Sequence, residues 1–324
     1  MRKTLKNIVL PVCISIAILY IFFRDISIND IKKAFSNIPT TYLFLFILLY
    51  IIGTILRAIK YNVLISKKLK FKDIFLITLV RNFSVDLLPA RSAALIFYSY
   101  LTKKKGISLE EGASSFIVSM FYDALALSLL LGTMFFFVKT QMNQTVIYIG
   151  LCFIFVVSII IIFFTDNIID LLLKIKLIKK NFKLKNILIN IHEYLIEHKK
   201  NSERLYLFFL SFIIRFIKYI SAYILFVGIV KITGSIQSLS MFSFGLAGTE
   251  LSSLLPIQGL GGFGTWELAF AFVFKVLEIP GNVDPRLTGI VIHITTQAWE
   301  YSIGLLAFLY ISFERKKSQN KKTI

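Results

Sequence analysis

The stretch LRAIKY at residues 56–61 recurs as IRFIKY at residues 214–219, and each copy lies inside a strongly apolar segment. Each copy is followed by Leu-Leu-Pro in a run of small residues, at 87–89 and at 254–256. An acidic residue in a further apolar segment follows each break, Asp123 in the first case and Glu300 in the second. The order of basic pair, broken segment and acid therefore occurs twice. A duplicated membrane protein with interrupted segments at matching positions has the build of a transporter, in which those segments line the substrate site.

The composition assigns the chain to the membrane. Of its 324 residues 56% are hydrophobic and 15% are aromatic, and the mean hydropathy is +0.76, all well above the values of a soluble protein. The formal net charge of +19 is a feature shared with nucleic-acid-binding proteins. However, Lys and Arg are concentrated in the short segments between apolar stretches, as is typical of membrane proteins. We therefore expect an integral membrane protein that has no nucleic-acid partner.

The apolar segments predict an all-α polytopic membrane protein, a single transmembrane domain over 1–324 with about eight to ten membrane segments. Two regions, 74–88 with 91–101 and 239–255 with 263–277, are pairs of shorter segments, each pair broken at a proline. Each pair is either a re-entrant hairpin or two short, tilted spans. Six further stretches are long enough for full spans, namely Asn7–Phe23, Tyr42–Ile65, Gly112–Val138, Val146–Phe164, Leu205–Val230 and Leu287–Phe313.

The distribution of basic residues predicts the orientation. Lys and Arg are concentrated in the N-terminus and in residues 66–73, 103–111, 166–204 and 314–324, so these parts are expected on the cytoplasmic side. Both termini are then cytoplasmic in a multi-pass protein of the cell's inner (cytoplasmic) membrane. The same rule gives repeat 1, about residues 41–138, the opposite orientation to repeat 2, about residues 205–313. The sequence thus predicts two inverted-topology repeats.

The linker between the repeats, about residues 166–204, alternates Lys with Leu and Ile. This pattern suits a basic amphipathic helix that lies on an anionic inner leaflet. A solvated linker between the repeats fits the pattern equally well, so the sequence leaves both interpretations open.

The second break contains the glycine-rich stretch GLGGFG, which formally satisfies the G-x-G-x-x-G pattern. A dinucleotide site is excluded because that pattern needs a preceding strand within a βαβ unit, whereas apolar membrane segments flank this one. The glycines are instead expected to expose backbone N–H groups at the start of a helix near Phe263, where an anion such as a lipid phosphate is favoured. Close helix packing is the alternative. The residues concerned are Gly259, Gly261, Gly262 and Gly264.

The first break contains Arg91 just past its proline, at the expected start of a helix. An arginine at that position opposes the helix dipole, so a partner is required. A phosphate bound bidentately would satisfy both the guanidinium and the helix N-terminus. Asp86 is the alternative partner within the chain.

The basic pairs of the two motif copies differ in their expected depth. Arg57 and Lys60 lie one helical turn apart near the cytoplasmic end of their span, where snorkelling to the interface explains them as well as a function does. Arg215 lies ten residues into its span, where snorkelling is hard and an internal partner is needed. Arg215 is therefore the leading candidate for substrate binding, and Arg57 and Lys218 are further candidates.

Four acidic residues in apolar segments are the candidate partners of these cations, because buried membrane charges pair with each other or with a substrate. In the last span His293, Gln297 and Glu300 are spaced to lie on one helix face. That face could conduct protons, hold a headgroup or form a structural network. The four acids are Asp123, Glu250, Glu267 and Glu300.

Several chemistries lack their usual motifs. Cys13 and Cys152 stand singly in apolar segments, so neither a disulfide framework nor a metal site is expected. The chain shows no Walker A motif, no nucleophile–base pair at a recognisable spacing and no soluble segment long enough for an ATPase or transferase domain. We therefore expect neither an enzyme nor a cofactor. Transport would run down a gradient, couple to an ion or proton gradient, or depend on another protein.

Taken together, these motifs resemble the membrane region of lysylphosphatidylglycerol synthases and their stand-alone, flippase-like relatives. The likeness covers nearly the whole chain and rests on residues 57–61, on 82–91 with its LLPAR sequence, on the turn at 106–108 that leads to Asp123, and on 255–267. It implies movement of a lipid, in family members an aminoacylated phosphatidylglycerol or a glycolipid, between the leaflets of a bacterial or archaeal membrane.

The chain departs from the pattern of this family at three points. Where many relatives have Gly-Glu after the Pro-x-Arg it has Ala93-Ala94, and where they have Glu-Arg ahead of the membrane aspartate it has Ser119-Met120. It also lacks the soluble aminoacyl-transferase domain of the full-length synthases. The identity of the lipid therefore does not transfer from the resemblance, and the chain is not expected to make lysylphosphatidylglycerol by itself.

Three functions remain open on the sequence. The leading one is a lipid flippase or scramblase, in which Arg91, Arg215 and the glycine-rich break bind the phosphate headgroup of a phospholipid or a polyprenyl-linked lipid in a midplane groove. The second is an ion-coupled small-solute transporter, whose buried acids bind cations. The third is an accessory subunit that positions a separate glycosyl- or aminoacyl-transferase through the basic linker. A homo-oligomer is compatible with all three.

Overall fold

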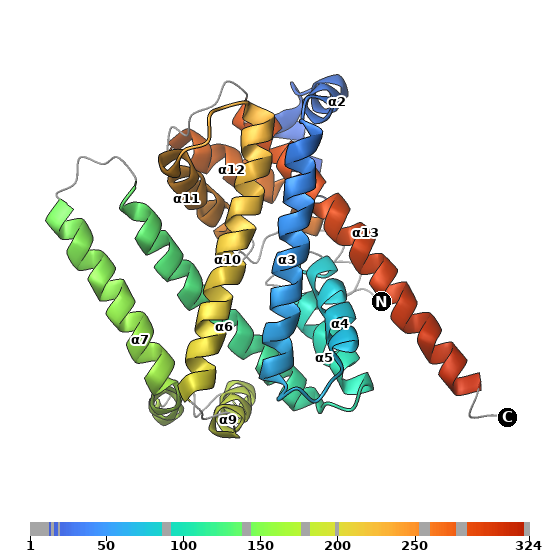
Figure 1. The fold of residues 1–324 in the computed structure, drawn as a ribbon, viewed down its shortest axis with the longest axis vertical. Coiled ribbons are helices and arrows are strands. Elements are labelled where there is room, and N and C mark those ends of the chain that lie inside the picture. The colour runs from blue at the N-terminus through green and yellow to red at the C-terminus, as the bar shows by residue number, and fades with distance from the viewer. Residues whose placement is uncertain are drawn as a thin grey trace. The chain divides into compact units, whose positions relative to one another are not determined.

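The computed structural model describes residues 13, 16–18, 20–85, 92–137, 144–175, 182–197, 201–252, 260–276 and 284–320. Within these ranges the chain is helical with short turns and contains no β-strand, as the sequence predicts (Figure 1). The helices are α2 (Ile28–Ser36), α3 (Thr40–Leu64), α4 (Phe71–Phe83), α5 (Ser92–Lys104), α6 (Leu109–Phe135), α7 (Gln144–Lys174), α9 (Phe182–Glu197), α10 (Asn201–Val230), α11 (Ile236–Ser252), α12 (Thr265–Val276) and α13 (Pro285–Asn320), with a 3₁₀ turn, η2, at Leu260–Gly262.

The long helices support a multi-pass membrane protein. Three helical segments in the described part of the chain are long and apolar enough to cross a bilayer by length and composition: Thr40–Leu64, Leu109–Phe135 and Ser202–Val230. They correspond to three of the six predicted full spans. The first predicted span, Asn7–Phe23, lies largely outside the described residues.

The two predicted broken regions are pairs of short helices. α4 and α5 are 13 residues each, and α11 and α12 are 17 and 12 residues, so each is shorter than the long helices around it. The Leu-Leu-Pro segments at 87–89 and 254–256, on which the prediction of a break rested, lie outside the described residues. A pair of short helices thus lies at each of the two places where the sequence predicts a pair of short segments.

The chain divides into two compact units. The first comprises Met1–Ile52, Leu76–Phe97 and Lys218–Ile324, and the second comprises Gly53–Phe75 and Tyr98–Ile217. Four helices, α3, α4, α5 and α10, cross from one unit to the other along their length.

In the first unit α12 packs between α11 and α13, and α13 also contacts α2 (Figure 1). The core between these helices is aromatic: the rings of Phe270 and Phe274 are stacked 3.7 Å apart, and Phe242 lies 5.6 Å from Phe274. Gly289 of α13 allows this packing, because a Cβ there would lie 2.9 Å from the Phe270 ring. The small residue therefore sets how closely α13 approaches α12.

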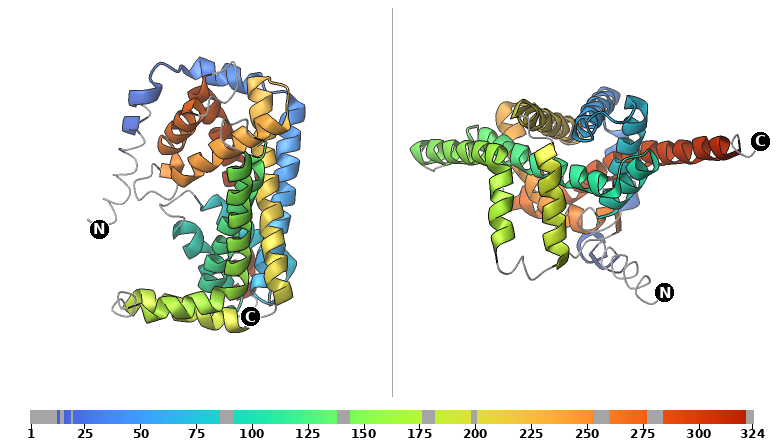
Figure 2. Two further views of the ribbon diagram at one scale, coloured as in Figure 1. Left: turned by 90° about the vertical axis from the view of Figure 1, so that its left-hand side faces the viewer. Right: turned by 90° about the horizontal axis from the view of Figure 1, so that it is seen from below.

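In the second unit α6, α7 and α9 pack against one another (Figure 2). α6 begins at a favourable cap, because the Ser108 hydroxyl accepts the N–H of Glu111 and two glutamates stand in the first turn. Its core face packs on an aromatic cluster, in which Tyr61 lies 4.6 Å from Tyr98 and is stacked with Phe116. These contacts fix the segment of α3 that carries Lys60.

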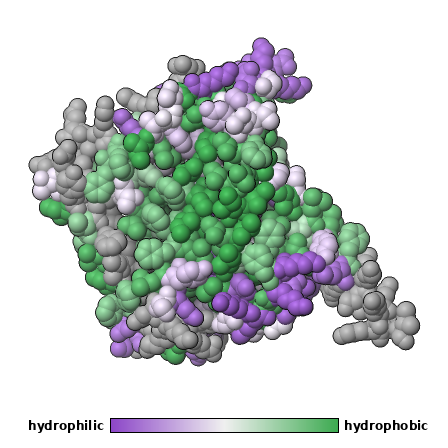
Figure 3. Space-filling view, in the orientation of Figure 1, coloured by the Kyte–Doolittle hydropathy of each residue, from purple (hydrophilic) through white to green (hydrophobic). Residues whose placement is uncertain are grey.

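Large apolar side chains remain exposed on the long helices. Figure 3 shows apolar side chains along α3, with hydrophilic ones gathered near helix ends. Such surfaces are costly in water and favourable against lipid acyl chains. On α3 the exposed residues are Phe44, Leu45, Leu48, Ile51, Ile52 and Ile55.

Candidate functional site

The ammonium of Lys60 is the centre of a buried polar cluster in the second unit. Nζ of Lys60 donates to Oδ1 of Asp123 at 2.6 Å, to Oγ of Ser211 at 2.9 Å and to the carbonyl of Ser119 at 3.1 Å. The Lys60 and Asp123 side chains are 1% and 5% exposed. A lysine has three N–H donors, and all three have an acceptor here. Lys60 therefore joins α3, α6 and α10 to one another and keeps no donor for a ligand.

Two arginines act on this ion pair. Arg57 precedes Lys60 by one turn of α3, and Arg215 follows Ser211 by one turn of α10. Both guanidinium groups interact electrostatically with Asp123, and Arg215 is 6% exposed. The basic pair of the first motif copy and the arginine of the second thus gather around Asp123. The sequence identifies these residues as separate candidate site residues, and it does not predict that they lie together.

The lysine of the second motif copy has a different partner. Nζ of Lys218 lies 2.5 Å from Oε1 of Glu250, which is on α11 in the first unit. The Lys218 side chain is 45% exposed, whereas that of Glu250 is 10% exposed. The two motif copies therefore place their lysines in unlike surroundings: Lys60 is sealed in a core, and Lys218 keeps an exposed side.

The glycines of the second break occupy backbone conformations that other residues avoid. Gly261, Gly262 and Gly264 have φ of 63°, 81° and 86°, in the left-handed region. A Cβ at Gly261 would also lie 3.0 Å from the Tyr301 hydroxyl. α12 begins at Thr265, and the N–H of Gly264 is bonded to Oε2 of Glu267 at 2.7 Å. Glu267 thus caps the start of α12. Its carboxylate occupies the N–H of Gly264, one of the backbone donors that the sequence analysis expects to face an anion.

A chain of polar side chains continues from Glu267 into α13. Its Oε1 lies 2.6 Å from Nδ1 of His293, and Nε2 of His293 lies 3.1 Å from the amide nitrogen of Gln297. These side chains are all buried. The rings of Phe263 and Trp266 lie 4.7 Å from the imidazole. Both oxygens of the Glu267 carboxylate are engaged, and the contact with His293 links α12 to α13.

Of the remaining predicted site residues, Glu300 lies partly buried in α13. Arg91 and Gly259 lie outside the described residues, as does Asp86, the alternative partner of Arg91. The predicted headgroup contacts of Arg91 and Gly259 therefore stay predictions.

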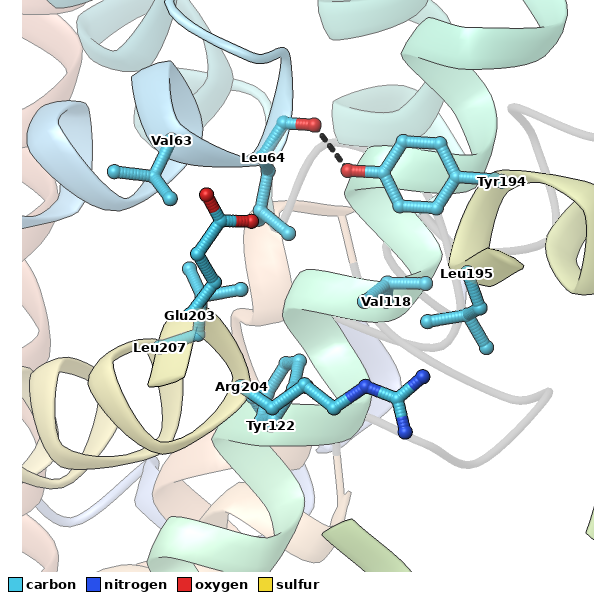
Figure 4. Close-up of a pocket in the computed structure, with 9 residues that line it drawn as sticks. All are labelled: Val63, Leu64, Val118, Tyr122, Tyr194, Leu195, Glu203, Arg204 and Leu207. Carbon is cyan, nitrogen blue, oxygen red and sulfur yellow. Dashed lines mark hydrogen bonds between the residues drawn. The ribbon is translucent and has the colours of Figure 1, made fainter. Parts of the chain in front are cut away.

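The second unit also contains a small pocket that the sequence did not suggest (Figure 4). At its edge the hydroxyl of Tyr194 donates to the carbonyl of Leu64, in the last turn of α3. Burial raises the pKa of this hydroxyl well above its ordinary value, so it remains a donor. The only sequence signal for this contact is a tyrosine in the apolar stripe of the basic linker. The lining residues are Val63, Leu64, Val118, Tyr122, Tyr194, Leu195, Glu203, Arg204 and Leu207.

Comparison with known proteins gives a match over most of the chain. Residues 8–295 match the family described as "Lysylphosphatidylglycerol synthase TM region". This range contains both motif copies, the Asp123 cluster and the Glu267–His293 contact. No curated protein matches the chain.

Proposed function

We propose that this chain, which belongs to the lysylphosphatidylglycerol synthase TM region family, moves a phospholipid or glycolipid between the two leaflets of its membrane. Family membership makes it a membrane protein associated with lipid chemistry. We propose that the protein is a flippase or scramblase and that it catalyses no covalent reaction. It sits in the cytoplasmic membrane with about six full spans, two broken helix pairs, inverted repeats and cytoplasmic termini.

The observation that carries the proposal is the gathering of Arg57 and Arg215 around Asp123 inside apolar helices. Charged groups within membrane spans are costly, so an intramembrane cluster of this kind is a candidate functional site. The anion that two guanidinium groups recognise best in a membrane is the phosphate of a lipid headgroup.

The division of roles within the cluster follows from donor counting. Lys60 uses all three of its N–H groups on protein acceptors, so it holds the helices together. A guanidinium has five N–H groups and can hold a protein partner and a phosphate at once. We therefore assign headgroup contact to Arg215 and Arg57, and a positioning role to Lys60.

Asp123 has a further role in this proposal. A carboxylate beside two arginines competes with a phosphate for the same donors, so it weakens the attraction for the headgroup. A translocation path must bind its substrate strongly enough to admit it and weakly enough to release it. Asp123 therefore weakens headgroup binding enough to allow release. The glycine-rich break and Arg91 are proposed as further headgroup contacts.

A second candidate function is supported by the Glu267–His293–Gln297 chain. A buried carboxylate in contact with an imidazole is a typical proton-binding arrangement in transporters. On this alternative the protein is an ion-coupled carrier of a small solute, and the arginines do not contact lipid.

Lipid retention separates the two functions. The protein is purified under gentle native conditions, and its bound lipids are compared for the wild type, Arg215→Gln and Arg57→Gln, with the exposed Arg24→Gln as matched control. We expect one phospholipid or polyprenyl-linked lipid to be enriched over the bulk membrane in the wild type and the control, and to be lost in the two cluster variants. Lipid that matches the bulk membrane in all four proteins would overturn the proposal in favour of the solute carrier.

A further inference from the structure

The segment between α7 and α10 forms a pair of helices that lies across the ends of longer ones. α7 breaks at Phe164, where φ is −108° and ψ is 18°, and the chain turns there. Residues 165–174 and α9 then lie side by side, crosswise to the first part of α7 (Figure 2). Nη1 of Arg204 donates to the carbonyl of Phe163 at 3.2 Å, next to the break in the helix. This helix pair, 165–174 with Phe182–Glu197, is called the crosswise pair below.

The crosswise pair is fixed to the second unit at one end. On α9 the side chains of Ile191, Tyr194 and Leu195 are buried, and Tyr194 donates to the carbonyl of Leu64 (Figure 4). That carbonyl belongs to the end of α3, where backbone acceptors lack partners within the helix. The two arms are also joined to each other, with His192 Nε2 3.2 Å from Asp170 Oδ1. The segment is therefore a docked structural element rather than a free tether.

The apolar stripe of α9 is longer than the protein surface that covers it. Ile187 lies one turn before Ile191 and therefore on the same helix face. Ile191 is 9% exposed, whereas Ile187 is 46% exposed and Leu188 is only partly buried. The opposite face carries exposed polar side chains, among them Asn186 and Glu193. The apolar face thus continues beyond the bundle and requires an apolar cover of another kind.

The charge of the segment identifies that cover. Residues 171–185 contain six lysines and no acidic residue, and the side chains of Lys174 and Lys185 are exposed. A basic amphipathic helix that lies crosswise at the ends of apolar helices fits the headgroup region of an anionic leaflet. Its apolar stripe then meets acyl chains, and its lysines meet lipid phosphates.

We propose that the crosswise pair is a membrane-surface anchor that binds anionic phospholipids, with Ile187 below the level of the headgroups and Asn186 in water. The anchor holds the end of α3 at the membrane surface through Tyr194 and gathers anionic lipid beside it. This inference does not depend on lipid translocation and holds equally for a solute carrier.

Spin labels placed on the two faces test the anchor. The full chain with Cys13→Ser and Cys152→Ser is labelled with a nitroxide at Ile187→Cys or, as matched control, at Asn186→Cys. Each protein is reconstituted in nanodiscs of phosphatidylcholine, with or without phosphatidylglycerol. Collisions with oxygen, which concentrates in lipid, are compared with collisions with a water-soluble nickel chelate.

We expect the label at 187 to collide mainly with oxygen and the label at 186 mainly with the chelate, with a larger contrast when phosphatidylglycerol is present. Replacing Lys174 and Lys185 by Gln is expected to reduce the effect of phosphatidylglycerol, whereas replacing the exposed Lys32 and Lys33 of α2 leaves it unchanged. Equal access of the chelate to both labels would overturn the proposal in favour of a solvated linker. A label at 187 shielded from both reagents would overturn it in favour of a contact between two copies of the chain.

Discussion

The ammonium of Lys60 on α3 lies 2.6 Å from Oδ1 of Asp123 on α6, and the two side chains are 1% and 5% exposed. They are separated by 63 positions in the sequence, so the pair connects distant parts of the second unit. In a protein that spans a membrane such a pair is costly to bury. Removal of only one of its two side chains leaves the charge of the other without its partner. Arg57 and Arg215 act on the same carboxylate. The pair therefore organises the charges to which we assign headgroup binding.

Removal of one partner of this pair is expected to destabilise the protein strongly. We expect Lys60→Ala to lower the free energy of unfolding by about 3–5 kcal/mol, because Asp123 remains buried without its main partner. The double variant Lys60→Met/Asp123→Leu should be more stable than Asp123→Leu alone, because the single variant leaves Lys60 as well as the two arginines without this carboxylate. Thermal unfolding in detergent measures both effects. Lys68→Ala is the control, since its partner Glu111 pairs with a half-exposed ammonium and such a pair contributes only about 0–1 kcal/mol.

A single methyl group at Gly304 is expected to disturb the first unit. A Cβ there would overlap the Cβ of Phe83 and lie 2.9 Å from the carbonyl oxygen of Leu79. We expect Gly304→Ala to cost about 1–3 kcal/mol, the range for overpacking a core. In Gly53→Ala the nearest atom lies at 3.5 Å, an ordinary contact, and Ala is the better helix former, so this variant should keep or raise the wild-type melting temperature. Equal melting temperatures for the two variants would contradict the packing of α4 against α13.

The cap formed by Glu267 is expected to depend on hydrogen bonding rather than on side-chain volume. Glu267→Ala leaves the Gly264 N–H and Nδ1 of His293 without their present acceptor, at about 1–3 kcal/mol for each buried group. Glu267→Gln retains an acceptor oxygen and should lose less. Thermal unfolding of the two variants compares them directly. If both lost the same stability, the carboxylate would not be acting as a hydrogen-bond acceptor to both groups.

The contact between Arg286 and Asp25 is expected to respond to pH. Hydrogen bonds from Arg286 hold the pKa of Asp25 below its ordinary value of 3.8. Because the folded pKa is the lower one, the stabilisation is present above pH 3.8 and disappears as the pH falls through the folded value. The difference in melting temperature between the wild type and Asp25→Asn should therefore persist from pH 7 to about 4 and vanish at lower pH. A difference that grew on acidification would contradict the assignment.

The sequence predicts the helices well because their signals are local. Runs of apolar residues set the long helices, and the two Leu-Leu-Pro breaks predict the short pairs α4 with α5 and α11 with α12. The positions of the charged candidates inside those helices follow directly from the same runs. These features depend on neighbours in the sequence and need no knowledge of packing.

The partners of the charges could not be predicted in the same way. The sequence contains four acidic residues in apolar segments and several cations that could pair with them. Helix periodicity shows which residues share a face of one helix, but not which residues on different helices are in contact. Packing places Asp123 beside Lys60, and it places Glu267 beside His293 and the Gly264 N–H. The predicted span Val146–Phe164 ends at the residue where α7 breaks, but the contact of Arg204 with the carbonyl of Phe163 is tertiary, so the sequence does not predict it.

Lipid movement in vesicles tests the central claim most directly. The wild type, Arg215→Gln and the control Arg24→Gln are reconstituted in liposomes that carry a phosphatidylglycerol with a fluorescent headgroup label, with and without a pH gradient. Dithionite then bleaches the labels that reach the outer leaflet. We predict that the wild type and Arg24→Gln let dithionite bleach label beyond the outer-leaflet share, and that Arg215→Gln does not. Inner-leaflet label that stays as protected with the wild type as in protein-free vesicles, under both conditions, would contradict the account.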